Sequence, residues 1–88
     1  MNKARRAKLK EALDILSAFD LGEVEQIVAD MQEEEQEGFD NLSEGLQASE
    51  RGQAMETACA ALEEAKDSIA EIQSSLENAI AKIEEACE

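Results

Sequence analysis

The chain has 88 residues and carries 22 acidic against 8 basic side chains, a net charge of −14 at pH 7. A chain this short forms one small domain, and so acidic a surface disfavours direct binding to nucleic acid or to an anionic membrane. No apolar run is long enough to span a membrane and no apolar segment follows the basic start, so we expect a cytoplasmic protein.

The first predicted helix covers about residues 3–38. Its apolar residues recur at helical spacing; they are Leu9, Leu13, Leu16, Phe19, Val24, Ile27, Val28 and Met31. The spacing slips where Asp20 is followed by Glu23, a pattern that resembles a capping box starting a new helix, and Gly22 costs a helix about 1 kcal/mol. Because no proline enforces a break, we expect a continuous or slightly kinked helix, with a restart at Asp20 as the alternative.

The second predicted helix covers about residues 52–87 and has the more regular pattern. Its apolar residues alternate spacings of three and four, as in a coiled coil; they are Met55, Ala58, Leu62, Ala65, Ile69, Ile72, Leu76, Ala79, Ile83 and Ala86. The small residues on one edge of this stripe allow a neighbouring helix to approach closely. The larger ones are candidate core or oligomer residues, namely Leu62, Ile69, Ile72, Leu76 and Ile83.

The two segments match in length, which predicts an all-α fold: an antiparallel, coiled-coil-like two-helix hairpin forming a single domain over residues 1–88. Folding back lays the basic start beside the acidic end, and exposed ion pairs of this kind contribute about 0.2–1 kcal/mol each. A hairpin leaves half of each apolar stripe uncovered, so we expect self-association, as a dimer or higher, into a helical bundle. Cys59 and Cys87 are about 42 Å apart along one helix and are expected to be reduced.

The segment between the helices, residues 39–51, has the composition of a short capped helical corner. Asn41 with Glu44 fits a capping box, Ser49 fits the N-cap of the second helix, and Leu42 with Leu46 suits one helical turn docking two leucines. Arg51 is the only cation between Lys10 and Lys66.

The isolated Arg51 has two interpretations. It forms an ion pair with Glu44 or Asp40, or it acts with Asn41 and Gln47 as a candidate ligand-binding group, since its planar fork suits a phosphate or a carboxylate.

The stretch EEEQEGFDNLSEGLQASERGQAMETA, residues 33–58, resembles the central motif of small acidic helical proteins found in phages and prophages of Firmicutes. That family usually has proline where this chain has Ser43, so the turn is expected to be less rigid here. The family has no settled enzymatic role. The resemblance therefore implies a phage accessory protein acting in the cytoplasm of a bacterial host.

Residues for the common catalytic chemistries are missing from the sequence. There is no histidine to act as a general base, and no phosphate loop, nucleophile elbow or EF-hand loop is present. The glutamates between Glu33 and Glu37 could hold Mg²⁺ or Ca²⁺ weakly, but a solvated face explains them better. We expect no enzyme, no cofactor and no metal site.

These features predict a non-enzymatic phage protein that binds and inhibits a host protein. The expected partner is basic or binds nucleic acid and belongs to an antiviral defence system, and the acidic second helix would imitate the phosphates of DNA. The candidate partner-binding residues are Glu63, Asp67, Glu71, Glu77, Glu84 and Glu85. Two alternatives remain: an oligomeric sponge that traps a nucleotide signal at Arg51, and a structural coiled-coil assembly protein.

Overall fold

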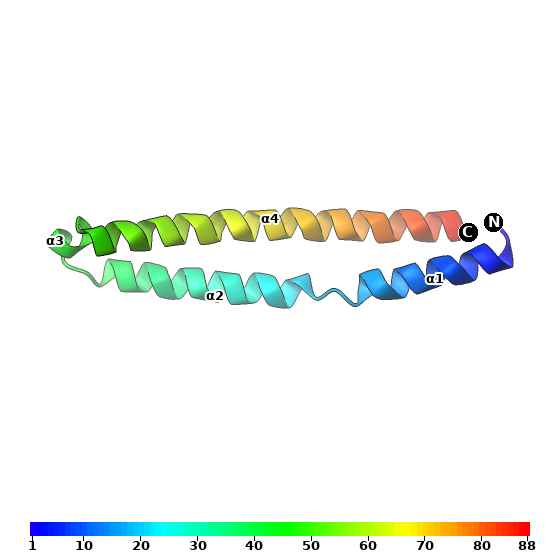
Figure 1. Ribbon diagram of the computed structural model, residues 1–88, viewed down its shortest axis with the longest axis horizontal. Helices are drawn as coiled ribbons and strands as arrows, with labels where there is room; N and C mark the ends of the chain where they lie inside the picture. Colours follow the sequence, from blue (N-terminus) through cyan, green and yellow to red (C-terminus); the bar gives the residue numbers. More distant parts are fainter.

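The computed structural model describes residues 1–88, and all its regular elements are helices. In chain order they are α1 (Lys3–Ser17), α2 (Leu21–Asp40), α3 (Glu44–Gln47) and α4 (Glu50–Cys87). Figure 1 shows α1 and α2 end to end along one side, α4 returning along the other, and both chain termini at the end opposite α3. We call α1 with α2 the first arm and α4 the second arm. The prediction of an all-α fold is confirmed.

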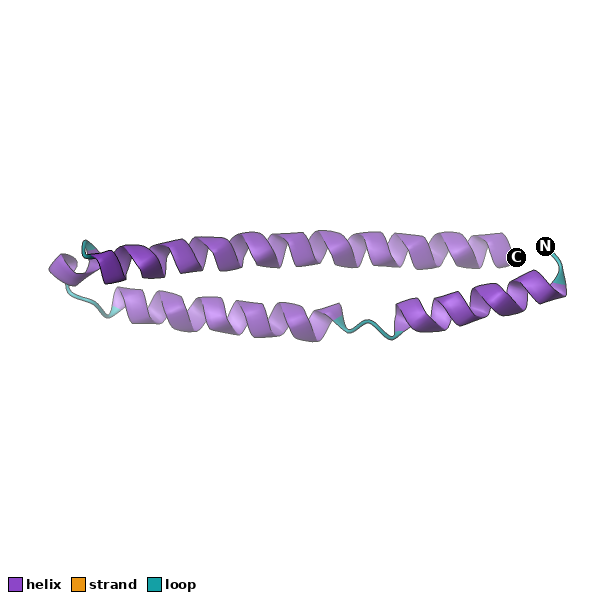
Figure 2. Cartoon of the chain, viewed as in Figure 1, coloured by secondary structure: helices purple, strands orange, loops and turns teal.

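The molecule is a thin rod with dimensions of 68 × 15 × 14 Å. Both α1 and α2 pack against α4, and only short loops connect the helices (Figure 2). Two residues are buried, Gly52 and Cys59, and no large side chain is fully enclosed. The interior is therefore a single seam between the two arms.

The first arm is broken, so the expectation of a continuous or slightly kinked helix is wrong. α1 ends at Ser17 and α2 starts at Leu21, with Asp20 as its N-cap. The Asp20 carboxylate accepts a hydrogen bond of 3.1 Å from the backbone N–H of Glu23. This bond satisfies one of the amides that a helix start leaves without a partner, so a break needs no proline.

The seam on α4 uses one edge of the predicted stripe along its whole length and the other edge only in the half nearer the corner. The buried or half-buried residues of α4 beyond Gly52 are Met55, Ala58, Cys59, Leu62, Ala65, Lys66, Ile69, Gln73, Leu76, Ile80, Ile83 and Cys87. On the second predicted edge Ala58 and Ala65 are half-buried, but from Ile72 onward the edge is exposed, and Ile72 itself is 53% exposed.

Polar residues of the first arm also lie in the seam. Glu25, Gln32 and Glu35 of α2 are half-buried. The half-buried polar residues of α4 in this seam are Lys66 and Gln73, and Glu35 lies close enough to Cys59 to act on its thiol.

Serines, and not Asn41, are the N-caps of α3 and α4. Asn41 is the C-cap of α2, and Ser43 caps α3 by accepting from the N–H of Leu46, so the prediction of an Asn41 N-cap is wrong. Ser49 caps α4 as predicted, accepting from the N–H of Gly52 at 3.3 Å. Leu42 is half-buried, but Leu46 is 53% exposed and does not dock.

The corner turns the chain without any residue in the left-handed region of backbone space. Its tightest point is Gly52, where a Cβ atom would overlap the carbonyl groups of Gln47 and Leu46. Gly45 has no atom within 4 Å of the corresponding position. Of these two glycines, only Gly52 is needed for space.

Candidate functional site

The six predicted partner-binding carboxylates are exposed and lie along α4. Their residues are Glu63, Asp67, Glu71, Glu77, Glu84 and Glu85. They occupy helix positions beside or opposite the seam, on the side away from Ile72. The backbone thus holds them in a row over about 33 Å, from Glu63 to Glu85 at 1.5 Å per residue.

Few of these carboxylates have a partner within the chain. Lys82 Nζ lies 3.2 Å from Glu85 Oε2, and Gln73 Nε2 donates to Glu77 Oε1 at 3.1 Å. The only other ion pair in the structure joins Lys8 to Glu11 at 3.4 Å, so no ion pair crosses between the arms. The charge of the row is therefore available to an outside partner.

The candidate ligand-binding residues at the corner are not brought together as a site. Gln47 Nε2 donates to the backbone carbonyl of Phe39 at 3.1 Å and so fastens α3 to the end of α2. Arg51 is exposed and forms no ion pair with Asp40 or Glu44, so that interpretation is wrong. Asn41 is also exposed, and no pocket opens at the corner.

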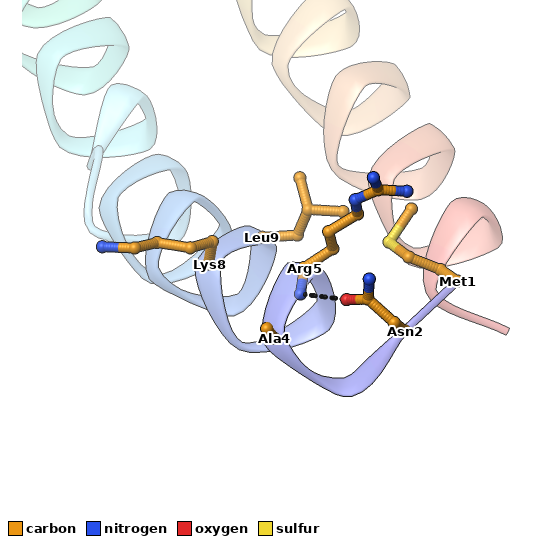
Figure 3. Close-up of a pocket in the computed structure, with 6 residues that line it drawn as sticks. All are labelled: Met1, Asn2, Ala4, Arg5, Lys8 and Leu9. Atoms are coloured by element: carbon orange, nitrogen blue, oxygen red, sulfur yellow. Dashed lines mark hydrogen bonds between the residues drawn. The ribbon is translucent and has the colours of Figure 1, made fainter.

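The structure has one groove, at the opposite end of the rod, which the sequence did not predict. Its volume is about 510 Å³, and it is lined by Met1, Asn2, Ala4, Arg5, Lys8 and Leu9 (Figure 3). Asn2 Oδ1 accepts a hydrogen bond of 2.8 Å from the N–H of Arg5 and caps α1. Figure 3 shows Met1 beside the end of α4. The basic composition of the start was the only sequence signal for this groove.

The glutamate run of α2 does not form a metal site. Glu33 and Glu37 lie four residues apart on one exposed face of the helix, with Glu34 also exposed, whereas Glu35 is half-buried. No group of three or more histidine, cysteine, aspartate or glutamate side chains is arranged to hold a metal ion.

Cys59 is the only buried side chain with chemical reactivity, and both cysteines are free. Burial raises the pKa of the Cys59 thiol, and the carboxylates of Glu35, Asp40 and Glu56 raise it further by repelling the thiolate. The neutral thiol thus favours the folded state below the ordinary cysteine pKa, and this contribution is lost as the pH rises through the raised value.

We expect iodoacetamide to modify Cys87 at least tenfold faster than Cys59 in the folded protein at pH 7.5, because alkylation requires an accessible thiolate. Mass spectrometry of the alkylated chain over time measures both rates, with Cys87→Ser isolating Cys59. In urea the two cysteines should react alike. Equal rates for Cys59 in buffer and in urea would contradict its placement in the seam.

Comparison with family models, with curated proteins and with solved structures returned no match. The likeness of residues 33–58 to phage proteins therefore stays a prediction. The helices of the structure do not combine the length and the apolar character that a membrane crossing demands.

Proposed function

We propose that this chain is a non-enzymatic binding protein, a helical hairpin that self-associates and engages a basic partner through the carboxylates of α4. The observation that carries the proposal is the exposed acidic row, which is turned outward and has no charge partner on the first arm. A row held by helix backbone is already in position, so binding orders few backbone groups.

The row suits a protein that binds nucleic acid. Six carboxylates over about 33 Å give one charge per 6–7 Å, about half the axial charge density of a single DNA strand. Such a row imitates the field of a phosphate backbone without matching it phosphate by phosphate. Together with the likeness to phage proteins, this supports a host protein of an antiviral defence system as the partner.

Neutralising part of the row should weaken capture of the partner from a bacterial lysate at least tenfold. The test variant is Glu63→Gln/Asp67→Asn/Glu71→Gln, whose three carboxylates have no hydrogen-bonded partner in the chain. Like binding to DNA, capture should fall with rising salt and with added duplex DNA. Pull-down followed by quantitative mass spectrometry measures the captured amount.

The matched control removes three exposed charges from the first arm, as Glu23→Gln/Asp30→Asn/Glu37→Gln. It should capture the partner as the unmodified chain does. If both triple variants capture the same proteins in the same amounts as the unmodified chain, the acidic row of α4 does not bind the partner.

A further inference from the structure

A band of uncharged side chains runs along one edge of both arms. In α4 the residues Ala58, Ala65, Ile72, Ala79 and Ala86 each directly precede a seam residue. In the middle of the first arm Ile15, Val24 and Met31 also directly precede half-buried residues, and Ile27 lies next to them on the outer side. Toward the two ends of this arm the residues that precede half-buried ones include the charged Lys8 and Glu34.

These edges lie on the same face of the rod. Two antiparallel helices that face each other are related by an approximate two-fold axis perpendicular to the plane that contains them. Residues that directly precede a seam residue in one arm therefore lie on the same face of the rod as residues that directly precede a seam residue in the other arm. Figure 1 shows the arms running antiparallel. We call the face formed by Ile15, Val24, Ile27, Met31 and Ile72, with the alanines between them, the uncharged face.

The uncharged face exposes side chains that a monomer in water does not favour. Ile15 is 66% exposed, Ile27 55% and Ile72 53%, while the seam contains Lys66 and Gln73. The carboxylates of α4 lie on the other sides of the helix. A stripe wider than one seam is typical of helices that contact two neighbours, as in a four-helix bundle.

The accessible area indicates how large the missing contact is. The chain exposes 6525 Å², whereas a compact protein of 9.6 kDa exposes about 5,100 Å². The excess of about 1,400 Å² exceeds the roughly 800 Å² that each partner contributes to a stable interface of standard size.

The distribution of charge along the first arm favours a second copy of the chain on the uncharged face, packed antiparallel to the first. Five basic residues lie within residues 3–10 and five acidic residues within residues 33–40, at opposite ends of this arm. A second copy laid antiparallel on the uncharged face brings each basic end over the acidic end of its partner, twice by symmetry. A parallel copy would instead place two acidic corners together.

The alignment of the two copies along the rod follows from the position of the exposed aliphatic residues along each arm. Gly38 lies against Met55, and with equal rise in both helices this contact places Leu21 level with Ile72. The exposed residues from Ile15 to Met31 are centred near that level. A two-fold axis at the level of Ile72 therefore brings the exposed aliphatic residues of the uncharged face against the same residues of the second copy. The same axis places Ala65 opposite Ala79 of the second copy.

We infer that two copies of this chain pack antiparallel through the uncharged face, with the two-fold axis at Ile72, into a four-helix bundle. This inference deepens the self-association in the proposed function and rests on it. The acidic rows of both copies remain outside the interface.

Cross-linking between alanine positions tests the inference. In a Cys59→Ala/Cys87→Ser background, the double variant Ala65→Cys/Ala79→Cys should be joined into a covalent dimer by a short bismaleimide. Each single variant should stay uncross-linked, because its two copies of the cysteine lie about 21 Å apart. Circular dichroism checks that the helix content is unchanged, and light scattering of the unmodified chain should give the mass of two copies.

A mass of one copy overturns the inference, as does a dimer whose double variant does not cross-link. Neither measurement involves the host partner. A cross-linked dimer whose capture of protein is insensitive to the α4 triple substitution would leave the inference standing and remove the acidic row from the proposed function. If the chain is a monomer whose capture of protein depends on the charges of α4, the acidic row stays in the proposed function and the dimer inference is overturned.

Discussion

Replacing Gly52 by alanine is expected to lower the free energy of unfolding by about 2–3 kcal/mol, near the upper end for overpacked sites. The added Cβ would overlap the carbonyl groups of Gln47 and Leu46. These are backbone atoms of α3, and they cannot move aside as the end of a long side chain can. Relieving the overlap would shift α3 against α4. A loss of this size in the free energy of unfolding is a large part of the total stability of a small domain.

Urea unfolding followed by helical circular dichroism measures this change, at one protein concentration because self-association adds to apparent stability. Gly45→Ala is the matched control, since no atom lies within 4 Å of its added Cβ. Alanine favours helix over glycine by up to about 1 kcal/mol, so this control should be neutral or stabilising. A Gly52→Ala chain as stable as the unmodified one would show that the corner is not as tight as described.

Replacing Ile72 by glutamate should raise the dissociation constant of the proposed dimer at least 100-fold. The two-fold axis at this residue would place two carboxylates against each other in an apolar contact, which costs both desolvation and repulsion. Sedimentation equilibrium over a range of concentrations measures the constant. The effect should exceed that of losing the isoleucine contact alone, which Ile72→Ala estimates.

Asn78→Glu is the control for this substitution, because Asn78 is exposed on the side of α4 away from the uncharged face. It adds one charge to the same helix and should leave the constant within a few-fold of its original value. Equal constants for the Ile72→Glu and Asn78→Glu chains would remove Ile72 from the interface.

The sequence predicted the helices well because their determinants are local. The absence of proline, the abundance of alanine and glutamate, and the regular spacing from Met55 to Ile83 each act within a few turns. The N-cap at Ser49 is also a local signal. The same kind of signal at Asp20 and Glu23 marks the break in the first arm, since a side-chain cap can start a new helix without any proline.

The side of α4 that meets the first arm could not be predicted from α4 alone. Leu62, Ile69, Leu76 and Ile83 belong to two overlapping rows of alternating spacing, one completed by alanines and Ile72, the other by Cys59, Lys66, Gln73 and Ile80. Periodicity fits both rows. The choice depends on which residues the first arm presents to α4, a relation between distant parts of the chain.

The N-cap of α3 and the groove could not be predicted for a similar reason. Asn41 and Ser43 are two residues apart and both fit an N-cap, so the pattern alone does not fix which one starts the helix. The bond from Gln47 to the Phe39 carbonyl joins groups eight residues apart with no local signature. The groove arises where the first nine residues curl at the end of the rod, and composition could show only that it is basic.

The break between α1 and α2 divides the rod into segments that can open separately. Asp20 supplies the start of α2 with a hydrogen-bond acceptor of its own, so α2 does not rely on α1 to cover that amide. We therefore expect α1 to detach from the end of α4 while α2, α3 and the first half of α4 remain folded. The molecule has a break in one arm only, and we expect its unfolding to start at the end with the chain termini and to move toward the corner.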